Sequence, residues 1–234
     1  SINRRQFLKS GAAAALPLLL PASVWRVRGA SGPNDRITLG YIGTGTQGRH
    51  LMNSFLPHPD VQVVAVCDVD TTRRKFYGKK AEEFYGTKQD KDFKGCAQYA
   101  DFRDLLQRKD IDAVVIATPD HWHAYPAVMA ANEGKDIYCE KPLSLTIHEA
   151  RAMVNATRKN ERVFQTGSMQ RSGGSFYRAC SLVRNGAIGR VKEVYVSVGG
   201  PSKWCDLPEE PMEPGLDWDM WLGPLRWRPY NRRY

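Results

Sequence analysis

The chain has 234 residues, a formal net charge of +9, and a composition of 25% charged and 42% hydrophobic residues. Residues 1–30 carry five of the nine net positive charges and no acidic residue, which leaves +4 for the rest and gives little support for nucleic-acid binding. The five cysteines are too few and too scattered to indicate a disulfide framework.

Residues 1–30 carry a pattern typical of a twin-arginine export signal. Arg4 and Arg5 precede an apolar stretch at 11–20. That stretch is too short and too interrupted by proline to span a membrane, so we expect no stable membrane span. We predict a signal peptide over 1–30, a linker over 31–36, a periplasmic or otherwise exported protein, and the twin-arginine export machinery as a partner.

The first predicted strand leads into a glycine-rich turn. The apolar run at 37–42 indicates a buried strand, and 47–55 indicates a helix. Between them, Gly43 permits a tight turn, Gly45 lets the backbone approach a pyrophosphate, and Gly48 allows close helix–strand packing. Amides at the helix N-terminus would face the phosphates. The predicted pyrophosphate-binding residues are Gly43, Gly45, Thr46, Gln47 and Gly48.

A second buried strand is predicted over 61–67, and Asp68 follows it. An acidic side chain there can accept hydrogen bonds from both adenosine ribose hydroxyls and would repel a 2′-phosphate, which favours NAD. Arg73 and Arg74 follow closely and can partly neutralise such a phosphate, so NADP stays open as the alternative cofactor. Glycines of an ordinary tight turn are the other interpretation, which the flanking strand, the helix and Asp68 all disfavour.

Strands and helices continue to alternate up to residue 166. Further strands are predicted at 112–117, 136–139 and 163–166, with helices ending at Asn132 and covering 146–160. This alternation indicates an α/β fold with a Rossmann-like, doubly wound parallel sheet, which we assign to 37–167. Ligands of such sheets lie beyond the carboxyl ends of the strands. The glycine turn, Asp68, the Thr118–Pro119 pair and the Glu140–Lys141 pair all follow strand ends, so we expect them at one edge.

Lys141 is the candidate catalytic residue. Oxidation of an alcohol carbon by hydride transfer requires removal of the hydroxyl proton, and a lysine ammonium can donate to the substrate oxygen or help to move that proton. A surface lysine before a proline is the alternative interpretation. His121, His123 and Cys139 do not assemble the three or four well-spaced ligands of a zinc site, so we predict no metal. For His123 we weigh a place beside the nicotinamide against local hydrogen bonding.

Five sequence segments together resemble the Gfo/Idh/MocA oxidoreductase family, which includes glucose–fructose oxidoreductase and inositol dehydrogenase. They are GTGTQG, CDVD, ATPDHWHA, GKDIYCEKP and GSMQRSG, within a similarity running from about 37 to 198. The resemblance implies an N-terminal Rossmann domain, a C-terminal open sheet carrying the substrate site, NAD or NADP, and homo-oligomers. It matches Lys141 to the catalytic lysine of the family. By the same resemblance, the residues that line the nicotinamide and its ribose are Thr118, Pro119, His123 and Glu140. Those on the adenosine side of the cofactor are Gly43, Gly45, Gly48 and Asp68.

The remaining residues, 168–234, are predicted to begin a C-terminal α+β domain for substrate binding and oligomerisation. A helix is expected over 175–184 and a half-exposed strand over 191–198. The proline- and tryptophan-rich stretch at 201–229 fits no regular element. This stretch either presents tryptophan faces to a sugar or, as we favour, packs on its own domain or on a neighbouring subunit. The family's Asp–His catalytic pattern is not found up to Tyr234, so we expect an incomplete domain and an inactive fragment.

Three functions follow from these residues. The leading hypothesis is an oxidoreductase that transfers hydride between a sugar, sugar acid or polyol and a nicotinamide cofactor. Outside the cytoplasm no nicotinamide pool is replenished, so the cofactor should be held tightly. The alternatives are an NAD-dependent glycoside hydrolase that works by transient oxidation and elimination, and a non-catalytic protein that binds cofactor or sugar. One glycosidase branch of the resembled family lacks the lysine, so Lys141 favours the oxidoreductase.

Overall fold

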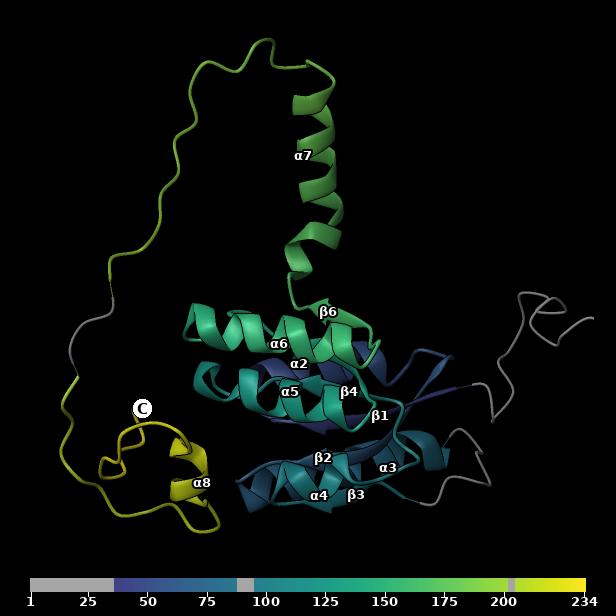
Figure 1. Ribbon diagram of the computed structural model, residues 1–234, viewed down its shortest axis with the longest axis vertical. Helices are drawn as coiled ribbons and strands as arrows, with labels where there is room; N and C mark the ends of the chain where they lie inside the picture. The colour runs from purple at the N-terminus through teal and green to yellow at the C-terminus, as the bar shows by residue number, and fades with distance from the viewer. Residues whose placement is uncertain (1–35, 88–94, 202–204) are drawn as a thin grey trace, which may run out of the picture. The chain divides into compact units, whose positions relative to one another are not determined.

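The computed structural model describes residues 36–87, 95–201 and 205–234. Its centre is a six-stranded parallel sheet in the order β3-β2-β1-β4-β5-β6 (Figure 1). The strands are β1 (Ile37–Ile42), β2 (Val61–Cys67), β3 (Ala97–Tyr99), β4 (Ala113–Ile116), β5 (Asp136–Cys139) and β6 (Phe164–Thr166). The strand order reverses at the β1–β4 pair, which is the switch point where doubly wound sheets bind their ligands. The predicted Rossmann-like sheet is confirmed.

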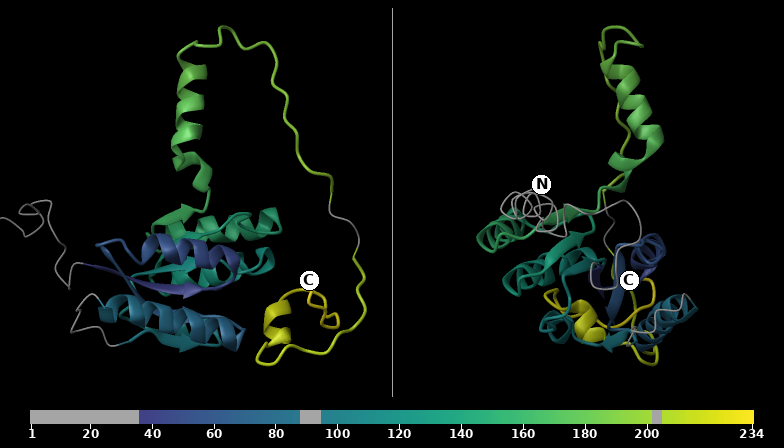
Figure 2. Two further views of the ribbon diagram at one scale, coloured as in Figure 1. Left: turned by 180° about the vertical axis from the view of Figure 1, so that it is seen from behind. Right: turned by 90° about the vertical axis from the view of Figure 1, so that its right-hand side faces the viewer.

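Helices cover both faces of this sheet (Figures 1 and 2). The α-helices are α2 (Thr46–Phe55), α3 (Thr71–Thr87), α4 (Phe102–Leu106), α5 (Ala124–Asn132), α6 (Ile147–Lys159), α7 (Gly174–Arg184) and α8 (Trp218–Leu222). Two short 3₁₀ helices are η4 (Asp120–Trp122) and η5 (Met169–Ser172). No helix within the described ranges combines the length and the apolar content needed to cross a membrane.

Two separate hydrophobic cores form, one on each face of the sheet. In β4, Val114 and Ile116 join the core that also contains buried residues of α4, α5 and α6. Val115 and Ala117 join the core formed with α2 and α3. Because β4 is buried on both faces, its sequence is continuously apolar rather than alternating. Full burial of one such valine stabilises the fold by roughly 1.5–3 kcal/mol.

The carboxyl ends of the strands are aligned in register. Ile42 at the end of β1 pairs with Cys67 of β2 and with Ile116 of β4. Ile116 pairs with Cys139 of β5, which in turn pairs with Thr166 of β6. The residues that follow these ends therefore meet at one edge of the sheet, as the sequence predicted.

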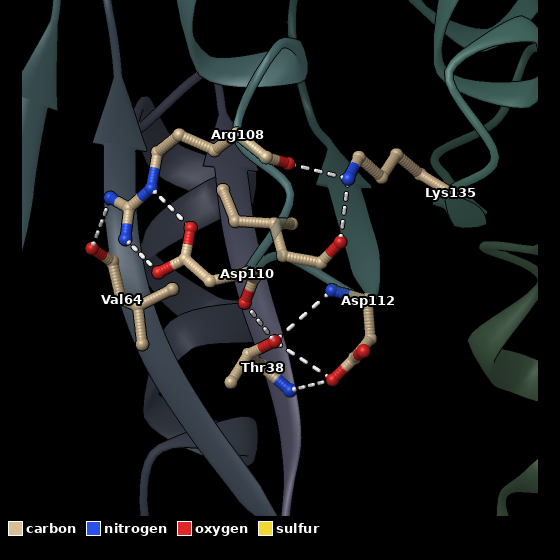
Figure 3. A network of polar contacts seen from close by, with 7 residues as sticks. Thr38, Val64, Arg108, Asp110, Asp112 and Lys135 are labelled. Carbon is tan, nitrogen blue, oxygen red and sulfur yellow. Dashed lines mark hydrogen bonds and ion pairs between the residues drawn. The ribbon is translucent and has the colours of Figure 1, made fainter.

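A polar network links residues near the amino ends of the strands, opposite the end that carries the glycine turn (Figure 3). The Arg108 guanidinium donates to both carboxylate oxygens of Asp110 at 2.9 and 2.6 Å, and to the Val64 carbonyl at 3.1 Å. Hydrogen bonding from Arg108 lowers the pKa of Asp110 below its usual value. Thr38 Oγ1 in β1 donates to the Asp110 carbonyl at 2.6 Å, while Asp112 Oδ2 accepts from the Thr38 amide at 2.8 Å. This network joins β1, β2 and the loop before β4.

Lys135 completes the network from the loop before β5. Its side chain is buried, at 4% exposure, and Nζ donates to the carbonyls of Arg108 at 2.5 Å and Ile111 at 2.8 Å. Burial lowers the pKa of Lys135. A buried ammonium needs such acceptors, and the two carbonyls would otherwise be left without a partner in a loop that carries no regular structure.

From β1 to α7, the predicted strands and α-helices agree with the observed ones within a residue or two, except that three elements were omitted. Two further errors lie after α7. The omitted elements are α3, β3 and α4. In α3 the aromatic residues come as adjacent pairs, Phe76–Tyr77 and Phe84–Tyr85, so the apolar residues do not show the spacing typical of a helix. The strand predicted over 191–198 is absent. No described strand pairs with this segment, so its backbone has no ladder to join. The stretch at 201–229 contains α8, although no element was expected there.

Three cysteines are buried and two are exposed. Cys67 ends β2, Cys139 ends β5, and Cys96 precedes β3, each with at most 4% exposure. Cys180 and Cys205 are exposed, and all five thiols are free. Cys67 and Cys139 pack in their strands as small hydrophobic side chains.

Candidate cofactor site

Two glycines of the turn after β1 are packed too closely to accept a side chain. Gly43 has φ +88°, and a Cβ there would lie 2.7 Å from the backbone of Ala117 and Thr118. A Cβ at Gly48 would overlap the carbonyl oxygen of Gly43. Helix α2 starts immediately after Gly45, and no side chain caps it. The first amides of α2 therefore point to the strand edge without an internal partner, as an anion site requires.

A pocket of about 240 Å³, here called the Asp68 pocket, lies where β1, β2 and β4 end. Its polar residues come from the glycine turn, the end of β2, the first turn of α3 and the turn after β4, and its apolar wall includes aromatic rings. The lining residues are Ile42, Gly43, Gly45, Thr46, Cys67, Asp68, Val69, Arg73, Ala100, Phe102, Ala117, Thr118, Pro119, Trp122, Met220 and Trp221. This combination of a polar side and an apolar wall is typical of a small-ligand site.

Asp68 is buried and hydrogen-bonded within the pocket. Its Oδ2 accepts from the amide and the hydroxyl of Thr44, both at 2.7 Å, and its Oδ1 accepts from the Asp70 amide at 2.9 Å. A carboxylate has about four acceptor positions, so further donors can still be bound. Arg73 lines the same pocket and pairs with Asp70 at 3.2 Å. Arg74 instead donates to the Asp68 backbone carbonyl at 2.6 Å, so its guanidinium stabilises the loop after β2.

A second pocket of about 570 Å³, here called the Lys141 pocket, lies where β4, β5 and β6 end. Its lining residues are Gln47, Ala117, Thr118, Asp120, His123, Glu140, Lys141, Gly167, Ser168, Met169, Gln170 and Arg171. Glu140 is buried at 4% exposure, and its Oε1 accepts from Gln47 Nε2 at 2.9 Å. This bond joins the start of α2 to the end of β5. Lys141 follows Glu140 and is exposed at the pocket.

His123 connects the two loops that carry Thr118 and Lys141. Its ring is buried at 1% exposure, with Nε2 2.9 Å from the Thr118 carbonyl and Nδ1 2.5 Å from the Pro142 carbonyl. A neutral ring can donate from only one nitrogen, and a doubly protonated ring from both. The imidazole therefore supports the loops through their backbones, which is a positioning geometry.

The Thr118 side chain provides a direct test of whether a dinucleotide fits. Thr118 lines both pockets, and its buried Oγ1 has no hydrogen-bond partner among the described residues. A buried hydroxyl without a partner costs roughly 1–3 kcal/mol, so such a group points to a missing ligand. An extended ligand crossing from one pocket to the other would pass this hydroxyl and the glycine turn. The residues present therefore fit a dinucleotide.

The structure brings the predicted site residues into these two pockets, with one exception. The Asp68 pocket contains Gly43, Gly45, Thr46, Asp68, Arg73, Thr118 and Pro119. The Lys141 pocket contains Gln47, Thr118, His123, Glu140 and Lys141. Gly48 lines neither and acts through packing against Gly43. No group of three metal-ligating side chains occurs in the described part of the chain.

Besides smaller apolar residues, the Asp68 pocket is lined by Phe102, Trp122, Met220 and Trp221, none of which was predicted there. Trp122 lies in the ATPDHWHA segment, of which only Thr118, Pro119 and the two histidines were considered for the site. Trp218 and Trp221 stack with ring centroids 4.7 Å apart, and Trp218 is buried. This agrees with the interpretation that the stretch at 201–229 packs on its own domain. Trp227 is exposed at 69%. In the Lys141 pocket the residues of η5 were also missed as lining residues.

A parallel sheet that reverses order at a glycine turn, with a pocket on either side of that turn, defines a dinucleotide-binding domain. The particular family follows from comparison. Residues 37–168 match the Gfo/Idh/MocA model, described as an oxidoreductase family with an NAD-binding Rossmann fold, and the chain belongs to this family. Residues 1–21 match the signal sequence of the twin-arginine translocation pathway, so the protein is exported by that route.

Relatives with different names are similar to this chain. An inositol 2-dehydrogenase of Salmonella paratyphi B is 31% identical over 64% of this chain and 42% of its own length. An α-N-acetylgalactosaminidase of Shewanella oneidensis is 27% identical over 82% of this chain and 44% of its own. The structure of a Lactobacillus casei scyllo-inositol dehydrogenase with bound NAD(H) and scyllo-inositol is similar with a TM-score of 0.56 and 26% identity, covering 66% of this chain and 42% of that one. The chain thus spans less than half the length of these relatives.

Proposed function

We propose that this chain is the cofactor-binding part of an exported oxidoreductase that transfers hydride between a CH–OH carbon of a sugar, sugar acid or polyol and a tightly held NAD. One observation carries the proposal: the Asp68 pocket and the Lys141 pocket share Thr118, whose buried hydroxyl lacks a partner in the described residues. The names of the inositol dehydrogenase relatives support a polyol or sugar substrate.

The residues of the Asp68 pocket would hold the adenosine half and the pyrophosphate. The uncapped start of α2 supplies amides and a positive helix end for the phosphates. Asp68, fixed by Thr44, would accept hydrogen bonds from the ribose hydroxyls, and its negative charge disfavours a 2′-phosphate. Arg73 is the counter-argument for NADP, but its guanidinium pairs with Asp70. NAD is therefore the cofactor we propose.

The Lys141 pocket would hold the reacting end. A bound nicotinamide supplies the hydride acceptor or donor. Lys141 would donate to the substrate oxygen as it gains charge and help to move its proton. Glu140, held by Gln47, fixes the end of β5, and His123 holds the loops on either side, so the lysine stays at the strand edge. We assign residues 168–234 to the beginning of the substrate and oligomerisation domain.

The direct test is native mass spectrometry of the full-length, signal-processed protein, purified without added cofactor. We expect a retained mass of NAD(H) rather than NADP(H), since an exported enzyme must keep the cofactor it carried out. Polyols and sugars are then added while absorbance at 340 nm reports reduced cofactor. Lys141→Met should lower turnover roughly 10²- to 10⁴-fold with the cofactor retained. The matched control is Lys79→Met, since Lys79 is an exposed lysine on α3.

A second function is favoured by the similarity to the α-N-acetylgalactosaminidase. Transient oxidation of a glycoside, elimination of the aglycone and return of the hydride would use the same two pockets. Release of aglycone from a nitrophenyl glycoside without net NADH would support this hydrolase and contradict the net oxidoreductase. A full chain that binds sugar but shows neither activity would leave a non-catalytic binding protein.

A further inference from the structure

Residues 215–223, here called the arm, are docked on the rim of the Asp68 pocket by two anchors. The first anchor joins the arm to the loop after β2. The Thr71 amide donates to the Gly215 carbonyl at 2.9 Å, and the Asp217 amide donates to the Val69 carbonyl at 3.1 Å. Leu216 forms an isolated antiparallel bridge with Asp70 between these two bonds. The anchor lies immediately after Asp68 in the chain.

The second anchor joins the end of α8 to η4. Trp122 Nε1 donates to the carbonyls of Met220 at 2.9 Å and Trp221 at 3.0 Å, and His121 Nε2 lies 2.8 Å from the Trp221 carbonyl. The last carbonyls of a helix have no partner inside it, so these side chains satisfy them. Gly223 lies against the Trp122 ring so closely that any Cβ would overlap it. Only glycine allows this contact.

The two anchors bridge opposite sides of the Asp68 pocket. One side is the loop after β2, and the other is the turn after β4. Between the anchors, Met220 and Trp221 line the pocket together with Phe102 and Trp122, whose rings pack edge to face at 5.5 Å. The arm therefore supplies part of an aromatic and thioether wall that faces the polar residues of the glycine turn and Asp68.

We propose that the arm closes the nucleotide pocket and that Met220 and Trp221 bind the adenine of the cofactor. This inference rests on the proposed function, because it assigns the base of the same dinucleotide. Asp68 fixes the position of the ribose, and the flat apolar wall is the surface beside it that suits a purine. Stacking of a base on an aromatic side chain is sequence-tolerant and strong enough to change affinity roughly 5- to 150-fold. The arm must detach from at least one anchor before the nucleotide leaves, so it also slows release.

The test measures the release rate of retained NAD from the full-length, signal-processed protein. Binding of 5′-AMP and NAD is then measured by calorimetry on the same protein after its retained cofactor has been removed. Trp221→Ala and Met220→Ala should each weaken both ligands roughly 5- to 150-fold and speed NAD release. Met220→Ala leaves the Trp218–Trp221 stack intact, which separates ligand binding from packing of the arm. Trp227→Ala is the matched control, because this tryptophan is exposed and outside the pocket.

The outcomes are distinguishable. If the unaltered chain binds NAD and 5′-AMP while both pocket variants bind them equally well, the arm does not hold adenine and this inference is overturned alone. If Trp227→Ala weakens binding as much as the pocket variants do, the effect is structural and the inference is again overturned. If the unaltered chain binds neither ligand, the proposed function fails and the inference fails with it. Far-UV circular dichroism melts of all variants show that they fold.

Discussion

Replacing Gly48 with alanine should destabilise the fold, although helix propensity alone predicts the opposite. Alanine is favoured over glycine in a helix by up to about 1 kcal/mol. In this structure, however, a Cβ at Gly48 falls well inside the 3.0 Å limit of real contacts, against the Gly43 backbone carbonyl. Backbone cannot move aside as a flexible side chain does. Overpacking of this kind costs about 1–3 kcal/mol.

The expected net loss for Gly48→Ala is therefore roughly 1–2 kcal/mol in the free energy of unfolding. The matched control is Gly86→Ala in α3, where an added Cβ meets nothing within 4 Å. That variant should be unchanged or more stable by up to about 1 kcal/mol. Because the displaced carbonyl belongs to the glycine turn, Gly48→Ala should also weaken NAD binding, whereas Gly86→Ala should not.

Urea unfolding followed by circular dichroism measures both variants under one set of conditions. Opposite signs for the two alanine substitutions are the expected result. A Gly48→Ala protein as stable as Gly86→Ala would refute the reasoning, because it would mean that α2 can move away from β1 at no cost. The Gly43 carbonyl would then not constrain the approach of the helix.

Three further predictions concern hydrogen bonds seen in the structure. Thr44→Val removes the hydroxyl that donates to Asp68 and should cost about 2 kcal/mol in urea unfolding, whereas no loss would mean that this bond adds nothing. Lys135→Met leaves one buried and one partly buried carbonyl without their donor and should cost roughly 1–3 kcal/mol with 5′-AMP affinity unchanged. Asp110→Asn should cost below about 1 kcal/mol at neutral pH, since the Asp110 carboxylate is exposed to solvent. Arg108 lowers the pKa of Asp110 in the folded state, so this stabilisation is present above about pH 4 and should fade as the pH falls below it; a difference that is constant with pH would contradict the assignment.

The alternating strands and helices from β1 to β6 could largely be predicted, because the residue pattern of each such element lies within its own short segment of sequence. β1, β2 and β5 were placed to the residue, since apolar runs bounded by glycine and acidic residues leave little choice of boundary. The strand edge followed from topology alone, and so did the gathering of Asp68 and Lys141 there. These inferences required no knowledge of side-chain contacts.

The remaining parts of the site depend on contacts between residues far apart in the chain. The commitment of Arg74 to the Asp68 carbonyl, and the restraint of Asp68 by Thr44, are geometric and leave no pattern in the sequence. Docking of the arm on Trp122 joins residues about a hundred positions apart. The strand at 191–198 failed for the converse reason: its alternation is real, but alternation alone does not supply a neighbouring strand.

The buried cysteines bear on how this domain survives outside the cytoplasm. Cys67 and Cys139 are the residues immediately before Asp68 and Glu140, so oxidation of either sulfur would push on a carboxylate of the site. Burial raises the pKa of the Cys67 thiol and raises that of Cys139 to about 12. Oxidants attack the thiolate, and a buried thiol with so high a pKa offers almost none. After export these two positions therefore resist oxidation through their burial alone, whereas the sulfurs of Cys180 and Cys205 are exposed.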